Sequence, residues 1–161
     1  MWQTSSTGYA DTERLGESLG QLLKGGEVLE LCADLGGGKT TFTRGLARGL
    51  ESQDTVSSPT FTLKKIYKGR AGLEIHHFDF YRLNEPGIVA DQLAESLKDL
   101  KVVTVVEWSD SIRDVLPEER LCIEFHPTSD VAEKRTMHIH YPESKAALIK
   151  ELETNLTEVE P

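Results

Sequence analysis

LELCADLGGGKTT, residues 29–41, is the stretch that decides the fold of this chain. An apolar, strand-like run leads into three glycines, and a lysine and two threonines follow them. This order matches the Walker A phosphate-binding loop, G-x-x-x-x-G-K-[ST], in which a strand ends in a glycine-rich turn that opens a helix. The first glycine of the pattern falls at Ala33, and alanine is the smallest residue that carries a Cβ. The stretch therefore predicts a nucleotide-phosphate site with one altered position.

Each part of this loop has a chemical use. Glycines let the backbone fold tightly and aim its N–H groups inward, and the helix that follows adds its positive N-terminal end. Lys39 can reach the β- and γ-phosphates, and the Thr40 hydroxyl can bind Mg²⁺. The residues expected to contact the nucleotide are Asp34, Leu35, Gly36, Gly37, Gly38, Lys39, Thr40 and Thr41.

Length and composition favour one soluble, globular domain over residues 1–161. The net charge is −9, with 27 acidic against 18 basic residues, which argues against strong, unaided binding to a nucleic-acid backbone. Cys32 and Cys122 have no metal-ligand spacing and lie in apolar runs, so we expect two buried thiols in a reducing compartment. Without a signal peptide or an apolar run of about 20 residues, the expected location is the cytoplasm, away from membranes.

Hydrophobic spacing predicts the order of helices and strands. Residues 1–8 are expected to form a short edge strand or an unfixed arm. Leucines at helical spacing follow them, with Asp11 or Thr12 as the expected N-cap of the first helix. Val102–Val106 is an apolar run interrupted only by Thr104, which is typical of a strand buried on both faces of a parallel sheet. Other strands are expected at 27–32, 61–66, 73–81, 121–125 and 136–141. Further helices are expected directly after the glycine-rich loop, at 85–99 and around 146–152. An acidic tail is expected to fray from about residue 155. The strands at 61–66 and 73–81 are expected to pair as an antiparallel hairpin.

A phosphate loop needs a carboxylate at the end of a nearby strand, to hold Mg²⁺ or to orient a water molecule. Glu107 ends the most apolar strand, and Asp79 ends the strand before it. A surface acid is the commoner role for a single carboxylate, but the phosphate loop favours a site role here. We place Glu107 ahead of Asp79 as the metal ligand and expect both within reach of the metal or its waters.

Other residues keep two interpretations each. Thr60, in a loop stiffened by proline, is either a nucleotide-sensing switch or the first residue of a strand. Trp108 is either a core aromatic residue or a shield over the site. His76 and His77 alternate faces, so at most one points at the site, and a structural role is favoured. For Arg135 a salt bridge is the default and a phosphate contact is the alternative.

Four segments together resemble one family. They are Asp34–Thr41, Ser58–Phe61 (SPTF), His77–Arg82 (HFDFYR) and Glu107–Ser109 (EWS). Their order and spacing are similar to the TsaE (YjeE) family, the small ATPase of bacterial tRNA threonylcarbamoyladenosine biosynthesis. The phosphate loop is common to many families, whereas the second and third segments together are specific. The resemblance extends from the first helix to the strand that contains Arg135.

This resemblance implies an α/β fold of the P-loop NTPase type. Its central sheet would be mostly parallel and flanked by helices, with the antiparallel hairpin and antiparallel C-terminal strands at its sides. It also implies slow ATP hydrolysis, with ADP bound between cycles and Mg²⁺ as the metal. The family acts on a TsaB–TsaD heterodimer, which modifies adenosine in tRNA, so tRNA would be met only through partners.

The resemblance also implies residue roles. Lys39 binds phosphate, Thr40 and the Walker B acid Glu107 hold Mg²⁺, and Asp79 is the second essential acid. The family further places Thr60 as the switch threonine, Trp108 beside the acid and Arg135 near the nucleotide. Ala33, where the family usually has glycine, and Gly37, often alanine there, depart from the pattern without removing a chemical group.

We therefore expect a Mg²⁺-dependent ATPase whose catalytic residues are Asp79, Glu107, Lys39 and Thr60. One rival is a small-molecule P-loop kinase, but residues 85–100 contain no arginine and one lysine, Lys98, which argues against an arginine-bearing lid there. The other rival is a nucleotide-gated binding module whose hydrolysis is incidental.

Overall fold

The expected α/β architecture is confirmed by a computed structural model of the chain, which describes residues 1–34, 36–59, 62–81, 87–128, 131 and 133–158. Within these residues seven strands form one sheet in the order β1-β7-β6-β2-β5-β4-β3. The strands are β1 (Trp2–Ser6), β2 (Val28–Cys32), β3 (Lys64–Lys68), β4 (Glu74–Asp79), β5 (Val102–Glu107), β6 (Leu121–Pro127) and β7 (Arg135–His140). The helices are α1 (Tyr9–Leu22), α2 (Lys39–Gly49), α3 (Gly87–Lys98) and α4 (Ala146–Thr157).

The centre of the sheet is parallel and its sides are antiparallel. β2 lies between β6 and β5, β5 also pairs with β4, and all of these pairs are parallel. The predicted hairpin is the antiparallel pair of β3 and β4, and the C-terminal strands β6 and β7 are antiparallel as well. Residues 2–6 form the edge strand β1 against β7. The carboxyl ends of the four parallel strands consequently meet at one edge of the sheet.

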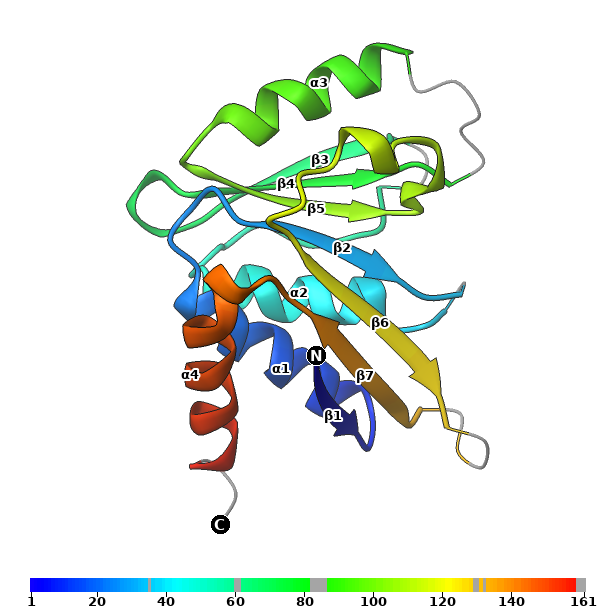
Figure 1. The fold of residues 1–161 in the computed structure, drawn as a ribbon, viewed down its shortest axis with the longest axis vertical. Helices are drawn as coiled ribbons and strands as arrows, with labels where there is room; N and C mark the ends of the chain where they lie inside the picture. Colours follow the sequence, from blue (N-terminus) through cyan, green and yellow to red (C-terminus); the bar gives the residue numbers. More distant parts are fainter. Residues whose placement is uncertain (35, 60–61, 82–86, 129–130, 132, 159–161) are drawn as a thin grey trace.

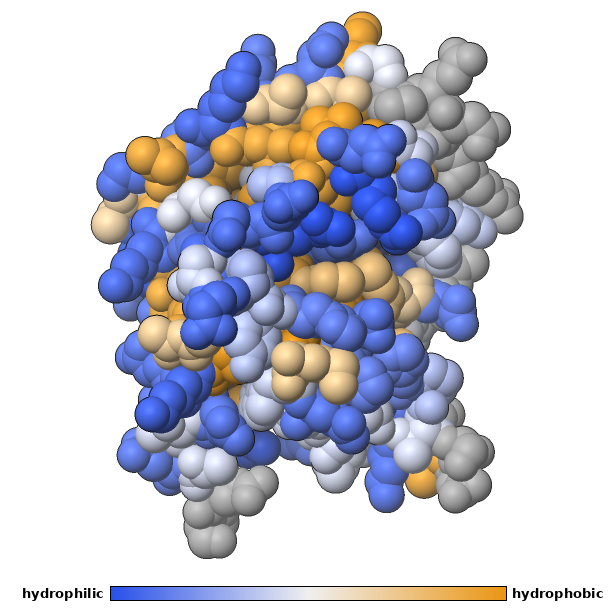
Figure 2. Space-filling view, in the orientation of Figure 1, coloured by the Kyte–Doolittle hydropathy of each residue, from blue (hydrophilic) through white to orange (hydrophobic). Residues whose placement is uncertain are grey.

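The two faces of the sheet are covered differently (Figure 1). One face packs against α1, α2 and α4 through the larger core cluster, which includes Leu19, Phe42 and Leu152. On the other face, α3 covers the β4–β5 side through a smaller cluster that includes Leu93 and Val106. Hydrophobic residues gather in the upper half of the molecule in Figure 2, near α3, and mostly hydrophilic residues lie over β6 and β7. On the face that α3 covers over β4 and β5, the side formed by β6 and β7 is therefore polar, and no helix of the described residues covers it.

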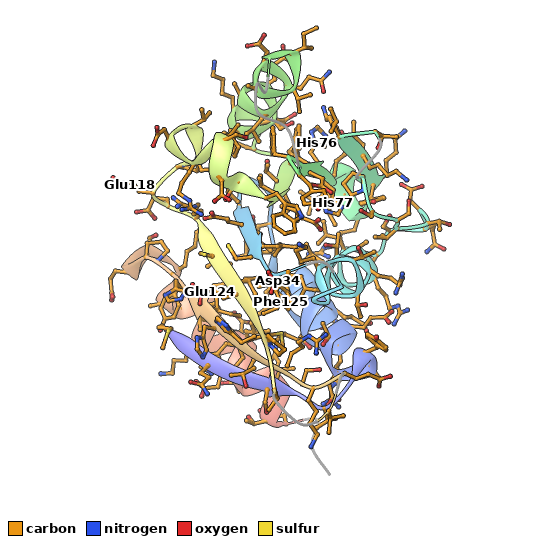
Figure 3. All side chains as sticks on the ribbon, turned by 90° about the vertical axis from the view of Figure 1, so that its right-hand side faces the viewer. Asp34, His76, His77, Glu118, Glu124 and Phe125 are labelled. Carbon is orange, nitrogen blue, oxygen red and sulfur yellow. The ribbon has the colours of Figure 1, made fainter. Side chains whose placement is uncertain are left out.

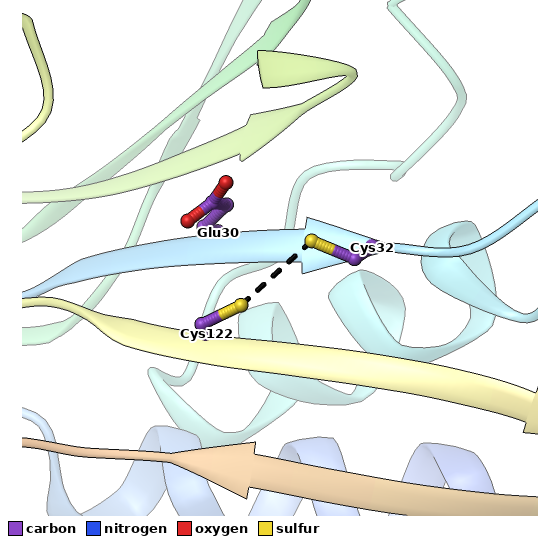
Figure 4. A group of neighbouring side chains, drawn as sticks. All are labelled: Glu30, Cys32 and Cys122. Atoms are coloured by element: carbon purple, nitrogen blue, oxygen red, sulfur yellow. Dashed lines mark hydrogen bonds between the residues drawn. The ribbon is translucent and has the colours of Figure 1, made fainter. Parts of the chain in front are cut away.

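The two cysteines differ from the expectation of buried thiols. Cys32 and Cys122 are only partly buried, and their Sγ atoms lie 3.8 Å apart on the neighbouring strands β2 and β6 (Figure 4). Both side chains point to the face that α1 and α2 do not cover, where Glu30 accompanies them. The apolar residues around each cysteine could not predict this partial exposure, because they do not show which face of the strand remains uncovered by helices.

Two predicted starts of elements are wrong. The first helix begins at Tyr9 with Gly8 as its N-cap, and the Asp11 carboxylate instead accepts a hydrogen bond from the N–H of Thr7. The hairpin strand begins at Lys64, because the carbonyl of Pro59 accepts hydrogen bonds from the N–H groups of residues 62 and 63 in a turn. In both cases a backbone N–H group near the boundary donates to a nearby oxygen atom outside the helix or strand ladder, and this hydrogen bond sets where the element begins.

The hairpin strand β3 buries a tyrosine, and part of the predicted frayed tail is helical. Tyr67 is buried, whereas Ile66 is 45 % exposed; residue 61 lies outside the described residues. At the C-terminus α4 continues to Thr157, and Leu156 packs against the core, so the chain is helical beyond residue 155. None of the described helices is both long enough and apolar enough to span a membrane.

Glycines allow α1 and α2 to pack with their backbones in contact. A Cβ on Gly45 would lie 1.9 Å from the carbonyl oxygen of Glu13, and one on Gly16 would lie 2.2 Å from that of Phe42. Gly20 and Gly49 are equally close to the opposite helix. The pair holds the phosphate-loop helix α2 firmly against α1, because no side chain separates the two backbones.

We expect Gly45→Ala to destabilise the protein by about 1–3 kcal/mol through overpacking, although alanine is the better helix former by about 1 kcal/mol. Urea unfolding of the two proteins measures this difference. The exposed neighbour Arg44 provides the control, since Arg44→Ala should change stability little. A Gly45→Ala protein as stable as the wild type would contradict the close helix contact.

Candidate functional site

The glycine-rich loop lies between β2 and α2, as the sequence predicts. Gly36 and Gly38 have φ angles of 74° and 104°, in the left-handed region that side chains other than glycine rarely adopt. The N–H of Gly37 donates to the carbonyl of Asp34 at 3.0 Å, and that of Phe42 donates to Gly38 at 2.9 Å as the first helical bond. Leu35, also predicted to contact the nucleotide, lies outside the described residues.

The two departures from the family pattern touch each other. A Cβ on Gly37 would lie 2.5 Å from the Cβ of Ala33, which is closer than two carbon atoms can approach. It would also lie 2.9 Å from the carbonyl oxygen of Asp34. The loop therefore has room for one methyl group at this contact, and in this chain position 33 carries it. In this chain the Ala33 methyl group occupies space that a side chain at position 37 would need.

Lys39 is the buried positive charge of the site. Its Nζ donates to the carbonyl of Ala33 at 2.8 Å and lies 4.1 Å from the centroid of the Trp108 ring. Burial lowers the pKa of Lys39, and the negative charges of Glu107 and Asp79 oppose that shift only in part. The lysine is thus held at the start of the phosphate loop and faces the two predicted acids.

The register of the sheet brings the two acids together. Asp79 and Glu107 are the last residues of the parallel neighbours β4 and β5, and their Cα atoms are paired in register. Glu107 is also paired with Leu31 of β2, the strand that leads into the loop. Their exposures are only 2 % and 3 %, so two carboxylates are buried beside the loop. Oδ1 of Asp79 accepts the N–H of Tyr81 at 2.8 Å.

His77 is a site residue that sequence reasoning missed. It is fully buried on β4, and its Nε2 lies 3.0 Å from Oε1 of Glu107. The other ring nitrogen, Nδ1, is buried and has no hydrogen-bond partner among the described residues. His76 on the opposite face contacts Ser96 at 2.6 Å instead, so one histidine of the pair does point at the site, as the alternation allowed. The strand pairing that positions His77 beside Glu107 is not visible in the sequence.

Aromatic residues and an arginine complete the surroundings. Trp108 is half-buried with a φ of 54°, and its ring contacts both Lys39 and the ring of Tyr81, whose centroid is 4.8 Å away. It therefore shields the lysine.

Arg135 contacts the phosphate loop. It donates from Nε to the carbonyl of Gly37 at 3.2 Å and from an Nη atom to the carbonyl of Gly36 at 3.3 Å. Thr60, the predicted switch threonine, lies outside the described residues.

Two hollows adjoin the loop at the carboxyl edge of the sheet, the edge that faces the viewer in Figure 3. One, of about 210 Å³, is lined by Tyr9 and by loop and helix residues from Gly36 to Thr41. The other, of about 450 Å³, is lined on one side by Ala33, Asp34 and Trp108 and on the other by the end of β6. The backbone of the loop is open to both, because no side chain projects from its glycines.

The donor set fits a magnesium–phosphate group. A hydroxyl at Thr40 and two buried carboxylates are oxygen ligands of the kind that Mg²⁺ prefers. The lysine and the loop N–H groups are the donors that phosphate oxygens need. The carboxylates of Asp79 and Glu107 are buried beside this lysine, at the ends of neighbouring strands.

Known proteins give a consistent comparison. The model of the family "Threonylcarbamoyl adenosine biosynthesis protein TsaE" matches residues 6–137. The chain is 39% identical over 120 residues to a Treponema pallidum tRNA threonylcarbamoyladenosine biosynthesis protein TsaE, covering 74% of this chain and 87% of that one. A Bacillus subtilis protein of the same name is 38% identical over 122 residues, covering 76% and 74%. The crystal structure of Bacillus subtilis YdiB superposes with a TM-score of 0.77 at 30% identity, covering 96% and 95% of the two chains.

The fold and the loop define a P-loop α/β protein with two buried acids at the carboxyl edge of its sheet. The chain belongs to the TsaE family, which functions in tRNA threonylcarbamoyladenosine biosynthesis.

The contact between positions 33 and 37 predicts a coupled pair of substitutions. Gly37→Ala alone should destabilise the protein, because its methyl group would overlap that of Ala33. Ala33→Gly in the same chain should recover much of the loss, which gives a coupling free energy of about 1–2 kcal/mol in a double-mutant cycle. Urea unfolding of the four proteins measures it. Strictly additive effects would show that the two positions do not compensate each other.

Proposed function

We propose that this chain is a Mg²⁺-dependent ATPase subunit that couples ATP binding and hydrolysis to turnover of a TsaB–TsaD partner complex. The observation that carries the proposal is the pairing of buried Asp79 and Glu107 in register, beside the loop that holds Lys39. Catalysis of phosphoryl transfer depends on positioning and charge stabilisation, which these groups supply. The pathway, tRNA threonylcarbamoyladenosine biosynthesis, comes from membership of the TsaE family. We also propose that the protein acts on a TsaB–TsaD complex and that it does so in the cytoplasm.

The chain's own residues account for binding. The loop N–H groups and the Lys39 ammonium bind the phosphate oxygens and stabilise the negative charge that develops during transfer. Thr40, Glu107 and Asp79 would hold Mg²⁺, which would supply positive charge beside the phosphate oxygens. Trp108, against the lysine side chain, keeps water from that ammonium, and Arg135 fixes the loop through the carbonyls of Gly36 and Gly37.

The same carboxylates account for the attack of water. One of Asp79 and Glu107 would orient the water in line with the γ-phosphate while the other serves the metal. His77 is a positioning residue, because its Nε2 lies 3.0 Å from Oε1 of Glu107 and fixes that carboxylate in a buried site. Thr60 is proposed to sense the γ-phosphate, as in other switch segments.

The surface supports work on protein partners rather than direct capture of tRNA. The net charge of −9 opposes strong binding to a phosphate backbone. The small-molecule kinase alternative is disfavoured by α3, whose Leu93 is fully buried in the core cluster on β4 and β5, so this helix serves as a layer of the fold. The other alternative, a nucleotide-gated binding module, predicts a different experimental result. In that case a non-hydrolysable ATP analogue alone would sustain repeated rounds of tRNA modification.

We expect Lys39→Ala and Glu107→Gln each to lower partner-stimulated ATP turnover by about 10²–10³-fold, because each removes charge that acts on the phosphates or on the metal. Phosphate release is measured with the TsaB–TsaD heterodimer present and absent. Binding of a fluorescent ADP analogue should weaken in Lys39→Ala. Lys150→Ala, an exposed change on α4, is the matched control and should keep wild-type turnover.

Wild-type rates in Lys39→Ala or Glu107→Gln would contradict the ATPase assignment. A phosphorylated small molecule as the product of ATP consumption would replace it with a kinase. Modification cycles that continue on the non-hydrolysable analogue would leave nucleotide binding without coupled hydrolysis.

A further inference from the structure

We propose that the open face of β6 and β7 carries a second metal site, for a divalent d-block cation such as Zn²⁺, formed by Glu124, His126 and His138. One ligand atom of each residue lies within 4.8 Å of the ligand atoms of the other two. The site is separate from the expected magnesium ligands, which lie at the ends of β4 and β5 and on α2.

The antiparallel register places the three side chains on one face. Glu124 and His126 are two residues apart on β6, and His138 on β7 is the cross-strand partner of Glu124. Figure 3 shows Glu124 and Phe125 on opposite sides of β6; the Phe125 ring packs on Phe42 of α2. The glutamate therefore points to the face that α1 and α2 leave open, where its side chain is 34 % exposed.

The distances between donor atoms suit a shared ion. Glu124 Oε2 lies 2.9 Å from His126 Nε2 and 3.8 Å from His138 Nδ1. At zinc–ligand distances of about 2.0–2.2 Å, tetrahedral geometry separates two ligand atoms by about 3.3 Å. The observed distances bracket that value, so small rotations of the side chains bring all three donors onto one cation.

His140 supports the ligand set from the next cross-strand position. Its Nε2 lies 3.3 Å from Oε1 of Glu124, whereas the other two histidines approach the second carboxylate oxygen, Oε2. This nitrogen is buried and has no properly aligned hydrogen bond within the described part of the chain. A second imidazole beside a ligating carboxylate is the arrangement that orients metal ligands. His140 is therefore a positioning residue, and the three-residue set leaves further coordination positions for water or another ligand.

The chemistry of the donors selects the class of metal. Imidazole nitrogens suit Zn²⁺, Cu²⁺ and Ni²⁺, whereas Mg²⁺ prefers oxygen ligands alone. Glu124 supplies the carboxylate oxygen of the set, which Zn²⁺ also accepts as a ligand. The rim of the 450 Å³ hollow includes Glu124 and His126 as well as Asp34, so a cation here would add positive charge beside the phosphate loop.

The partly buried group of Glu30, Cys32 and Cys122 is the competing location on this face, and it fits a cation less well. Both carboxylate oxygens of Glu30 are already used, by Arg120 at 2.7 Å and by the Ser109 hydroxyl. Arg113 adds a further positive charge 3.6 Å from the same carboxylate. These contacts neutralise Glu30 and repel a cation.

Calorimetric titration of the full-length protein with Zn²⁺, in nucleotide-free buffer, tests the site. We expect one zinc ion per chain, and His126→Asn and His138→Asn should each weaken the affinity by at least about 100-fold. His140→Gln should weaken it by about 10-fold and keep the stoichiometry, as outer-shell changes do. The control is the double variant Cys32→Ser/Cys122→Ser, which should bind zinc as the wild type does.

Two further readouts keep the test independent of folding and of ATP turnover. Zinc should raise the melting temperature of the wild type and of the cysteine variant, but not of His126→Asn/His138→Asn. Co²⁺ bound in place of zinc should show no thiolate charge-transfer band. Unchanged zinc affinity in His126→Asn, loss of binding in the cysteine variant, or a wild type that binds no zinc at 100 μM would each overturn the proposal; the assigned ATPase activity would be untouched by any of them.

Discussion

Two carboxylates and one lysine, all buried, are the constraint on which the rest of the site depends. Removing a charge from water costs several kcal/mol unless other charges and hydrogen bonds compensate it. Lys39 is compensated by Asp79 and Glu107, by the carbonyl of Ala33 and by the Trp108 ring. His77 in turn holds Glu107. The oxygen atoms and the ammonium of this group are of the kinds that Mg²⁺ and phosphate oxygens bind.

The sequence could predict those parts of the site that depend on local signals. A glycine pattern between a strand and a helix specifies a loop, and a carboxylate after an apolar run specifies a strand end. Parallel pairing converts these local facts into proximity, because it aligns the ends of β2, β5 and β4 at one edge. Asp79 and Glu107 could therefore be placed near the loop before any coordinates were known. Their separate roles, and those of Leu35 and Thr60, remain predictions.

Features that depend on contacts between distant residues could not be read in the same way. His77 resembles a structural histidine in sequence, and only the register of β4 against β5 shows that its ring meets Glu107. Ala33 and Gly37 look like two separate defects, and only the curvature of the loop shows that the two positions are in contact. Gly8 replaces Asp11 as the helix cap because the chain arrives extended from β1, which no helical periodicity records.

The unequal covering of the sheet explains why one small domain can carry two kinds of polar group. On β5, Glu107 points to the same face as Val103 and Val105, which α1, α2 and α4 cover, so it is only 3 % exposed and has to be neutralised within the fold. On the opposite face, β6 and β7 lack a covering helix within the described residues, so Glu124 and three histidines remain in contact with water and can exchange partners. Oxygen donors and an ammonium in the dry region suit magnesium and phosphate, whereas imidazoles at the wet edge suit a softer cation. Because β2 lies between the two regions, the loop that ends it is adjacent to both.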